Sequence, residues 1–274
     1  MAPMKHHNRP ALPGLTGDEK FIIPDWPAPA NVRACVTTRL GGVSTPPWAG
    51  FNLAAHVGDN PDAVSKNRET LTEALSLPSP PRWLEQVHGN TAVEITDHTG
   101  ITPPDHALRA YPPCRGDAAI AKEAGPVCAV LTADCLPVLF CDRAGTRVAA
   151  AHAGWRGLAD GVLESAVAAL DAAPEDLLAW LGPAIGPEAF EVGGEVREIF
   201  VRTRPEAALA FVSTSPGHWR ADLYLLARQR LERLGLRAVY GGDFCTWRDS
   251  ERFFSYRRDG VTGRMASLIW MEER

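Results

Sequence analysis

The segment that most restricts the fold is residues 126–158, PVCAVLTADCLPVLFCDRAGTRVAAAHAGWRGL. Its three short apolar runs, residues 127–131, 138–141 and 147–151, predict buried strands. From Trp155 the apolar residues recur at helical spacing, which predicts a helix with one apolar face. Cys135 and His152 each lie where a strand gives way to a turn. Polar side chains at strand ends are held by rigid backbone and can face a cleft, so both are candidate functional residues.

The chain is long enough to bury a full hydrophobic core, with 274 residues of which 45% are hydrophobic and 22% are charged. Residues 1–19 contain Pro, Gly, Asn and His without periodicity and are expected to form a flexible tail. Residues 20–274 are expected to form a single domain. Strand-like and helix-like segments follow one another without a regular βαβ series, which favours a mixed α/β or α+β fold with much antiparallel sheet.

Charge and hydropathy exclude several classes of partner. The chain has 28 Lys and Arg against 33 Asp and Glu, a formal net charge of −5, and no basic cluster, so we expect no nucleic acid partner. No apolar stretch reaches the roughly 18 residues that span a bilayer, and the first residues contain no signal-peptide core. We therefore expect a soluble cytoplasmic protein without a membrane partner. Its six cysteines lack framework spacing and need no disulfides. The sequence leaves the oligomeric state open.

Other segments complete the expected order of elements. Apolar residues at helical spacing predict helices over residues 61–77, 195–201 and 223–234, the first beginning after the N-cap candidate Asn60. Strand-like runs cover residues 32–38, 116–121, 177–181, 237–240 and the stretch around Cys245. Hairpins are predicted for residues 83–96, split by a turn at His88, and for residues 253–256 with 264–271. The proline-rich loop 101–115 is long enough to act as a flap.

Three potential metal ligands lie at strand ends: His88, Cys135 and His152. Two imidazoles and one thiolate that leave a fourth position open suit catalytic zinc, and copper also accepts these donors. The competing interpretation makes Cys135 a nucleophile with His152 as its base, a pair that needs no metal. Asp134 or Asp117 would then orient the histidine, although either carboxylate also suits a turn whose amides it satisfies.

Eight motifs in a fixed order carry a resemblance to a known family. They are TTRLGGVS (37–44), FNLAAHVGD (51–59) with NR (67–68), QVHG (86–89), GDAAI (116–120), TADCLPV (132–138), AHAGWRGL (151–158), LGPAIGP (181–187) and FFSYRRDGVTGR (253–264). In this set the chain resembles the laccase-domain family, also called the multicopper polyphenol oxidase or purine nucleoside phosphorylase family. The resemblance extends from about residue 32 to residue 271.

The resemblance implies a fold, a metal and an activity. The implied fold is a single α+β domain with layers in the order α-β-β-α and mixed sheets, similar to a cysteine-hydrolase toxin domain. The implied metal is zinc, held by His88, Cys135 and His152, with copper as the alternative. Family members are implied to phosphorolyse adenosine, inosine, guanosine and methylthioadenosine and to deaminate adenosine. The family is also implied to include peptidoglycan-editing relatives and, by its older name, copper-dependent phenol oxidases.

These implied reactions assign expected roles to residues. Cys135, His152, His88 and Asp134 are the expected catalytic residues. The expected substrate-binding residues are Arg39, Asn52, Asp117 and Arg257. Arg39, in the glycine-rich loop, is the first candidate for phosphate and Arg257 the second, because a guanidinium holds two oxygens at once. Asn52 is the candidate for the ribose. Each of these residues also suits a purely structural role, as an ion-pair partner or a turn cap.

We therefore expect a zinc enzyme that acts on purine nucleosides with phosphate as the second small-molecule substrate. Adenosine deaminase activity would need an unusual layout, because the HxE and PCxxC signature of zinc deaminases is absent. The first alternative is a Cys135-dependent hydrolase that cleaves an amide in a peptidoglycan precursor. A copper polyphenol oxidase is the weaker alternative, because coupled coppers need many histidines and this chain has eight, with no HxH pair.

Overall fold

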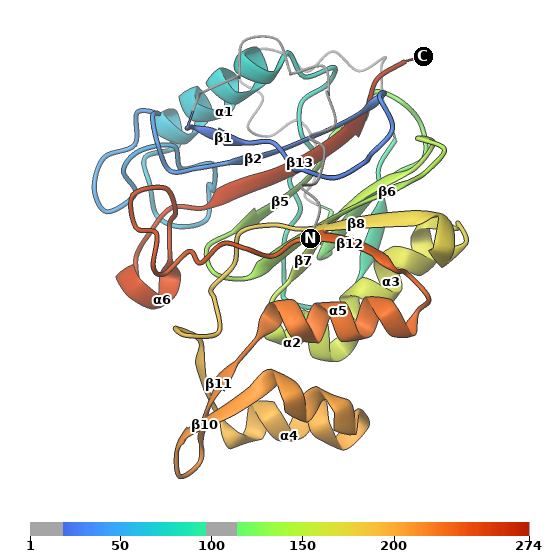
Figure 1. The fold of residues 1–274 in the computed structure, drawn as a ribbon. Coiled ribbons are helices and arrows are strands. Elements are labelled where there is room, and N and C mark those ends of the chain that lie inside the picture. Colours follow the sequence, from blue (N-terminus) through green and yellow to red (C-terminus); the bar gives the residue numbers. More distant parts are fainter. Residues whose placement is uncertain (1–18, 97–113, 274) are drawn as a thin grey trace, which may run out of the picture.

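The computed structural model describes residues 19–96 and 114–273. The predicted N-terminal tail, apart from residue 19, and the predicted flap, apart from residues 114–115, lie outside the described residues. Two β-sheets stack face to face, and helices cover their outer faces (Figure 1). No helix in the described ranges is both long and apolar enough to cross a membrane.

The first sheet has four antiparallel strands in the order β1-β2-β13-β5. They are β1 (Phe21–Ile22), β2 (Val32–Thr37), β13 (Met265–Met271) and β5 (Cys128–Thr132). The last strand of the chain, β13, lies between β2 and β5 and is buried along its whole length. An apolar run without alternation is what a strand covered on both faces requires.

The second sheet has six strands in the order β12-β8-β6-β7-β4-β3. They are β12 (Ala238–Gly241), β8 (Leu177–Leu181), β6 (Leu136–Asp142), β7 (Val148–Ala153), β4 (Ala118–Ala121) and β3 (Ala92–Glu94). The two outer pairs, β12 with β8 and β3 with β4, are parallel, and the inner pairs are antiparallel. The sheet is therefore mixed, as predicted.

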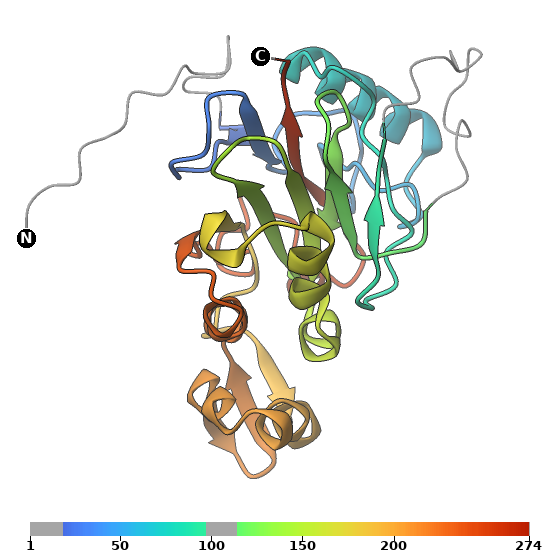
Figure 2. The same ribbon diagram turned by 90° about the vertical axis from the view of Figure 1, so that its right-hand side faces the viewer.

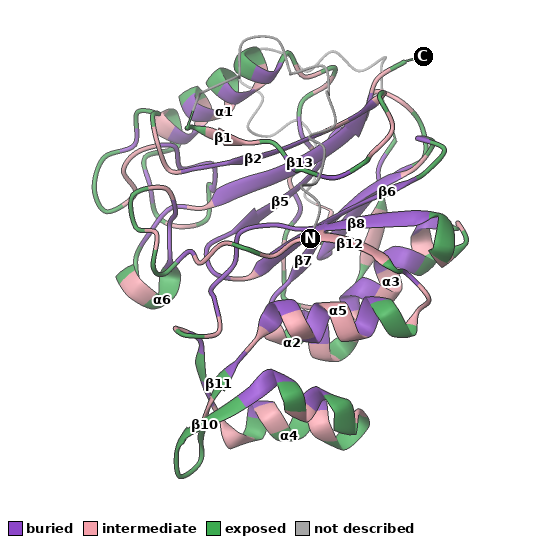
Figure 3. Cartoon of the chain, in the orientation of Figure 1, coloured by how far each residue is buried: buried purple, intermediate pink, exposed green. Residues whose placement is uncertain are grey.

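The facing strands of the two sheets are buried (Figure 3). Their apolar side chains form the central core, which includes Val130, Leu139 and Ile269. Helix α1 (Pro61–Leu75) covers the outer face of the first sheet through Leu71 and Leu75. The outer face of the second sheet is covered by α2 (Trp155–Asp160), α3 (Val162–Leu170) and α5 (Leu223–Arg233). The α-β-β-α layers and mixed sheets are confirmed, while the likeness to a cysteine-hydrolase toxin domain stays a prediction.

A small extension packs beside α5 and was not predicted as a unit (Figure 2). It contains β9 (Glu191–Gly193), α4 (Gly194–Thr203), the short 3-10 helix Pro205–Ala210, β10 (Phe211–Ser215) and β11 (His218–Ala221). A further 3-10 turn, Pro174–Asp176, precedes β8. The sequence did not predict β10, because four of its five residues are exposed and it therefore has no apolar pattern.

Both predicted hairpins are wrong. Within residues 83–96 only β3 is a strand, and it pairs in parallel with β4 rather than with a preceding strand. In the C-terminal pair, residues 264–271 form β13 as predicted, but residues 253–255 are irregular and lead into the short helix α6 (Tyr256–Asp259), which Ser255 caps by accepting from the Arg258 amide. The stretch around Cys245 is also irregular rather than a strand. The predicted central helix breaks at Gly161, whose φ of 92° ends α2 and begins α3.

Candidate active site and metal centre

Cys135 lies in the crossover that takes the chain from β5 in the first sheet to β6 in the second. The preceding residue, Asp134, has a φ of 92°, which turns the backbone sharply. Its carboxylate accepts a hydrogen bond of 2.6 Å from the Thr246 hydroxyl and one of 2.6 Å from the Arg257 amide. Two segments distant in sequence therefore fix the turn that presents the thiol.

His152 lies in β7, beside the start of β6, where it is paired with Pro137. Its Nδ1 lies 2.8 Å from Oδ1 of Asp117, and both side chains are buried. Because Asp117 occupies Nδ1, the other ring nitrogen, Nε2, is left to face Cys135 or a metal.

Asp117 also holds the loop that carries His88. Its carboxylate accepts the backbone amides of Val87, His88 and Gly89 at 3.2, 3.0 and 2.8 Å. These bonds hold His88 in a left-handed conformation with a φ of 61°. One buried carboxylate thus orients the imidazole of His152 and the backbone of His88 together.

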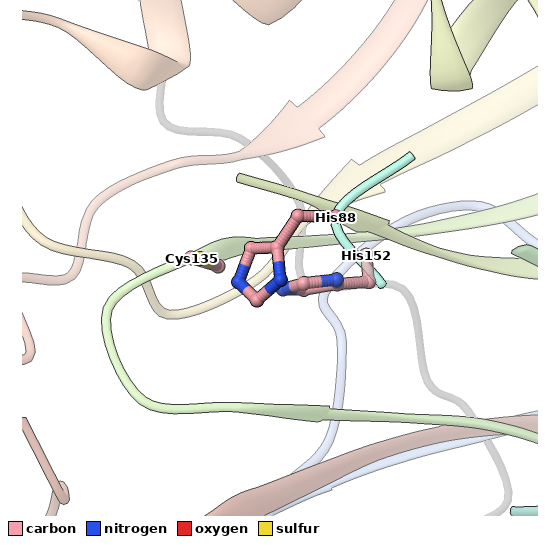
Figure 4. A group of neighbouring side chains, drawn as sticks. All are labelled: His88, Cys135 and His152. Atoms are coloured by element: carbon pink, nitrogen blue, oxygen red, sulfur yellow. The ribbon is translucent and has the colours of Figure 1, made fainter. Parts of the chain in front are cut away.

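The imidazoles and the thiol converge at one point (Figure 4). One donor atom from each of His88, Cys135 and His152 lies within 4.8 Å of the other two, and the two rings stand edge to face with centroids 4.8 Å apart. Ligands of tetrahedral zinc at bond lengths of 2.0–2.3 Å lie about 3.6 Å apart, so a small closure completes the set. This is the one such group of His, Cys, Asp and Glu side chains in the described part of the chain.

Gly154 makes room for this convergence. A Cβ at this position would lie 2.7 Å from the Cys135 sulfur and 3.4 Å from Cδ2 of His88. Any larger residue would therefore push the thiol or the imidazole away from the common point. The side chains present fit a zinc or copper ion, and the nature of the metal is left open by this donor set.

The charges at the centre favour a thiolate. Burial raises the pKa of Cys135, but the charge and hydrogen bonds of His152 and His88 outweigh it and lower that pKa to about 6. Burial lowers the pKa of His152, while the Cys135 charge and the Asp117 hydrogen bond raise it to about 9. Without a metal the pair is therefore a thiolate and an imidazolium at neutral pH, and the thiolate is the form that binds metals or attacks carbonyls.

The four predicted substrate-binding residues lie in different surroundings, and one of them belongs to the centre. Asp117 lies in the centre. The guanidinium of Arg39 donates to the carbonyls of Ala49 and Ser250 and lies over the ring of Phe254. Asn52 is fully buried, and its amide bonds to Ala54 and to other loop groups. Arg257 is exposed and its Nη1 donates to the carbonyl of Glu191. Substrate binding by these residues stays a prediction.

Three residues that position or face the centre were not singled out from the sequence: Gly154, Thr246 and Arg264. Gly154 and Arg264 lie inside quoted motifs, AHAGWRGL and FFSYRRDGVTGR, but nothing in a single sequence separates them from their neighbours. Thr246 lies in the stretch that was predicted as a strand. No feature of the neighbouring sequence indicates that its hydroxyl would donate to Asp134.

One cavity of about 520 Å³ lies beside the crossover, not over the thiol. It is lined by the turn at Gly186 and by residues 242–245 and 248, together with residues of α5. The polar groups that line it are largely engaged. Arg228 donates to the carbonyls of Val239 and Gly241, and the Tyr224 hydroxyl donates to the carbonyl of Phe244. None of the three converging donor residues borders this cavity.

Comparison with known proteins adds a family and named relatives. The family model described as "Multi-copper polyphenol oxidoreductase laccase" matches residues 33–272. The chain is 55% identical over 252 residues to purine nucleoside phosphorylase YfiH of Escherichia coli, covering 92% of this chain and 99% of that protein. It is 57% identical over 254 residues to purine nucleoside phosphorylase PA4543 of Pseudomonas aeruginosa, with the same coverage.

Solved structures show the same fold. The crystal structure of Neisseria meningitidis protein NMB0706 superposes with a TM-score of 0.85 at 50% identity, covering 93% of this chain and 100% of that one. YlmD from Geobacillus stearothermophilus superposes with a TM-score of 0.81 at 36% identity, covering 89% of this chain and 93% of that one.

Proposed function

We propose, from the premise that the chain belongs to the multi-copper polyphenol oxidoreductase laccase family, that it is a metal-dependent purine nucleoside phosphorylase. The observation that carries the proposal is the convergence of His88, Cys135 and His152 in a chain whose relatives at 55% and 57% identity bear that name. Zinc is the proposed metal, because two imidazoles and one thiolate with an open position are typical of its catalytic sites.

The proposed reaction joins phosphate to a purine nucleoside. A phosphate oxygen forms a bond to C1′, the bond from C1′ to the purine nitrogen breaks, and its electron pair leaves with the base, which takes up a proton. The products are ribose 1-phosphate and the free purine. When bound, the metal supplies a Lewis acid that stabilises negative charge at the reacting centre.

The side chains of the site have distinct proposed tasks. His88, the exposed member of the centre, faces the entering substrate, while Cys135 and His152 form its floor. Asp117 keeps Nδ1 of His152 protonated and so keeps Nε2 directed at the centre. Asp134 connects the crossover to the segments of Thr246 and Arg257 by hydrogen bonds. Side chains of both segments are thereby proposed to border the substrate. Adenosine deamination is proposed as a second activity of the same site.

One alternative also has a supporting observation. The Cys135 thiolate, the His152 imidazolium and the Asp117 carboxylate form a chain of nucleophile, proton donor and orienting carboxylate. This arrangement suits a cysteine hydrolase that attacks an amide carbonyl without a metal. The amide of a peptidoglycan precursor is the substrate class for that alternative.

The deciding experiment is product analysis of the purified protein, with its metal content measured, after incubation with adenosine in the presence and absence of phosphate. Phosphorolysis predicts adenine and ribose 1-phosphate only when phosphate is present. Inosine formed without phosphate would identify deamination. If no nucleoside is converted while an amide substrate is cleaved in a Cys135-dependent manner, the phosphorylase proposal is wrong and the hydrolase takes its place.

A further inference from the structure

The proposed reaction needs a cationic group for phosphate beside the centre, and the arginines near it differ in how many donors they have left. All three guanidinium nitrogens of Arg39 donate to carbonyl oxygens of the protein. The guanidinium nitrogens of Arg258 likewise all donate within the protein. Their acceptors are the carbonyls of Thr246, Trp247 and Phe253 and the carboxylate of Asp259. A phosphate would have to break these bonds to reach either guanidinium.

Arg264 emerges directly beside the crossover. It immediately precedes β13, whose first residue, Met265, is paired with Thr132 at the end of β5. The chain that leaves β5 becomes the crossover with Asp134 and Cys135, so Arg264 and the crossover begin from the same end of one strand pair. The Arg264 amide donates to the buried Asn52 side chain at 2.9 Å, which fixes its backbone.

The guanidinium of Arg264 is half-buried but only partly used. Its Nη1 donates to the carbonyls of Thr262 and Gly263 at 2.9 and 3.0 Å. Its Nε and Nη2 donate to no acceptor in residues 19–96 and 114–273. Burial lowers the pKa of Arg264, whereas the nearby charges of Cys135 and Asp134 act in the opposite direction. A cation near the Cys135 crossover thus keeps two nitrogens for a ligand.

Neighbouring groups fit the same ligand. The Thr262 hydroxyl is buried and has no hydrogen-bond partner in the described part of the chain, although a buried hydroxyl normally has one. Burial and then the charges of Arg264 and Arg68 lower the pKa of His56, which favours its neutral form, so the two arginines supply the positive charge here. Arg68 itself is anchored to the Leu53 carbonyl. Positive charge with spare donors is what a phosphate dianion requires.

We propose that Arg264 binds the phosphate that attacks C1′, through its Nε and Nη2, with the Thr262 hydroxyl as an additional donor. This inference rests on the proposed phosphorylase function and assigns its second substrate a position. In this arrangement the phosphate lies beside the crossover that carries Asp134 and Cys135. Its positive charge also offsets the repulsion between the phosphate and the Asp134 carboxylate.

The kinetic test compares Arg264→Gln and Arg264→Lys with the wild-type protein, all loaded with metal. Loss of a charge-assisted, two-nitrogen contact is expected to raise the KM for phosphate about ten- to a hundred-fold in Arg264→Gln. The KM for the nucleoside and the metal content are expected to stay close to wild type. Arg264→Lys keeps the charge and should recover part of the phosphate affinity. Arg202→Gln, an exposed arginine of α4, is the matched control.

A second measurement does not depend on turnover. Inorganic phosphate is expected to raise the thermal unfolding midpoint of the wild-type protein and of Arg202→Gln, and to leave Arg264→Gln unchanged. An equal shift in all three proteins, or a wild-type phosphate KM in folded Arg264→Gln, would overturn the inference and leave the phosphorylase proposal standing. If phosphate stabilises only proteins that retain Arg264 but no nucleoside is converted, the anion site holds and the proposed function fails.

Discussion

Asp117 connects the two histidines of the centre, since its carboxylate bonds to the His152 ring and to the amides of residues 87–89. Burial raises the pKa of Asp117, but the hydrogen bonds and charge of His152 and the amides of Gly89 and His88 lower it below its usual value. The group is therefore a carboxylate with no solvent contact, whose negative charge is neutralised by the groups that it orients.

Asp117→Asn is expected to weaken metal binding about ten- to a hundred-fold. The amide nitrogen of Asn faces backbone donors and cannot accept from them, so His88 and His152 lose their common support. A competition titration against a chelator measures this change. Asp142→Asn is the matched control, because Asp142 is also buried and accepts the amides of Thr146 and Arg147, far from the centre. Equal metal affinity in both variants would contradict the role of Asp117.

At the scale of elements, a cluster of Arg230, Glu164 and Arg204 connects the helices that cover the second sheet. Arg230 of α5 is 5% exposed and donates to Glu164 of α3 at 2.6 Å and to the Ala159 carbonyl of α2 at 3.2 Å. Arg204 donates to the same oxygen of Glu164 at 3.0 Å and links the end of α4 to this cluster. Three helices and the small extension therefore meet at the Arg230–Glu164 pair.

Glu164→Gln is expected to lower the free energy of unfolding by about 2 kcal/mol, because Arg230 is left with a buried charge and a weaker neutral acceptor. Urea unfolding followed by circular dichroism measures the change. The exposed pair Lys66 and Glu69 on α1 provides the comparison, and Glu69→Gln is expected to change stability by less than about 0.5 kcal/mol. Equal effects in both variants would show that the cluster adds nothing beyond a surface pair.

For the whole molecule, the centre lies at one end of a two-sheet sandwich whose core is formed without it. The buried strands β5, β6 and β7 supply Cys135 and His152 from their ends, so the metal would join elements that apolar packing already holds. A zinc-dependent mini-domain differs, because there the metal replaces the core.

Removal of the metal with a chelator is therefore expected to abolish the proposed phosphorolysis while far-UV circular dichroism stays unchanged. The thermal unfolding midpoint should fall by several degrees, because the ion binds the folded state. Zinc added afterwards should restore both midpoint and activity. Loss of secondary structure on chelation would instead assign the metal a structural role.

The local sequence pattern determined several helices and strands of this protein. The apolar runs around Cys135 and His152 predicted β5, β6 and β7 to within two residues at each end, and residues 177–181 form a strand as expected. Asn60 caps α1 through the Asp62 amide, as its position before Pro61 indicated. These features depend on neighbours in sequence, where backbone preference and the spacing of apolar residues act directly.

Tertiary structure alone decided how the distant residues meet. His88 and Asp117 are far apart in the chain, and the parallel pairing of β3 with β4 brings their loops together, where a hairpin had been predicted. That Arg264 keeps donors which Arg39 and Arg258 have used was equally invisible in the sequence, because the acceptors around each guanidinium are placed by the fold. Hydrogen-bond partners across the chain depend on the complete packing, and no local preference encodes them.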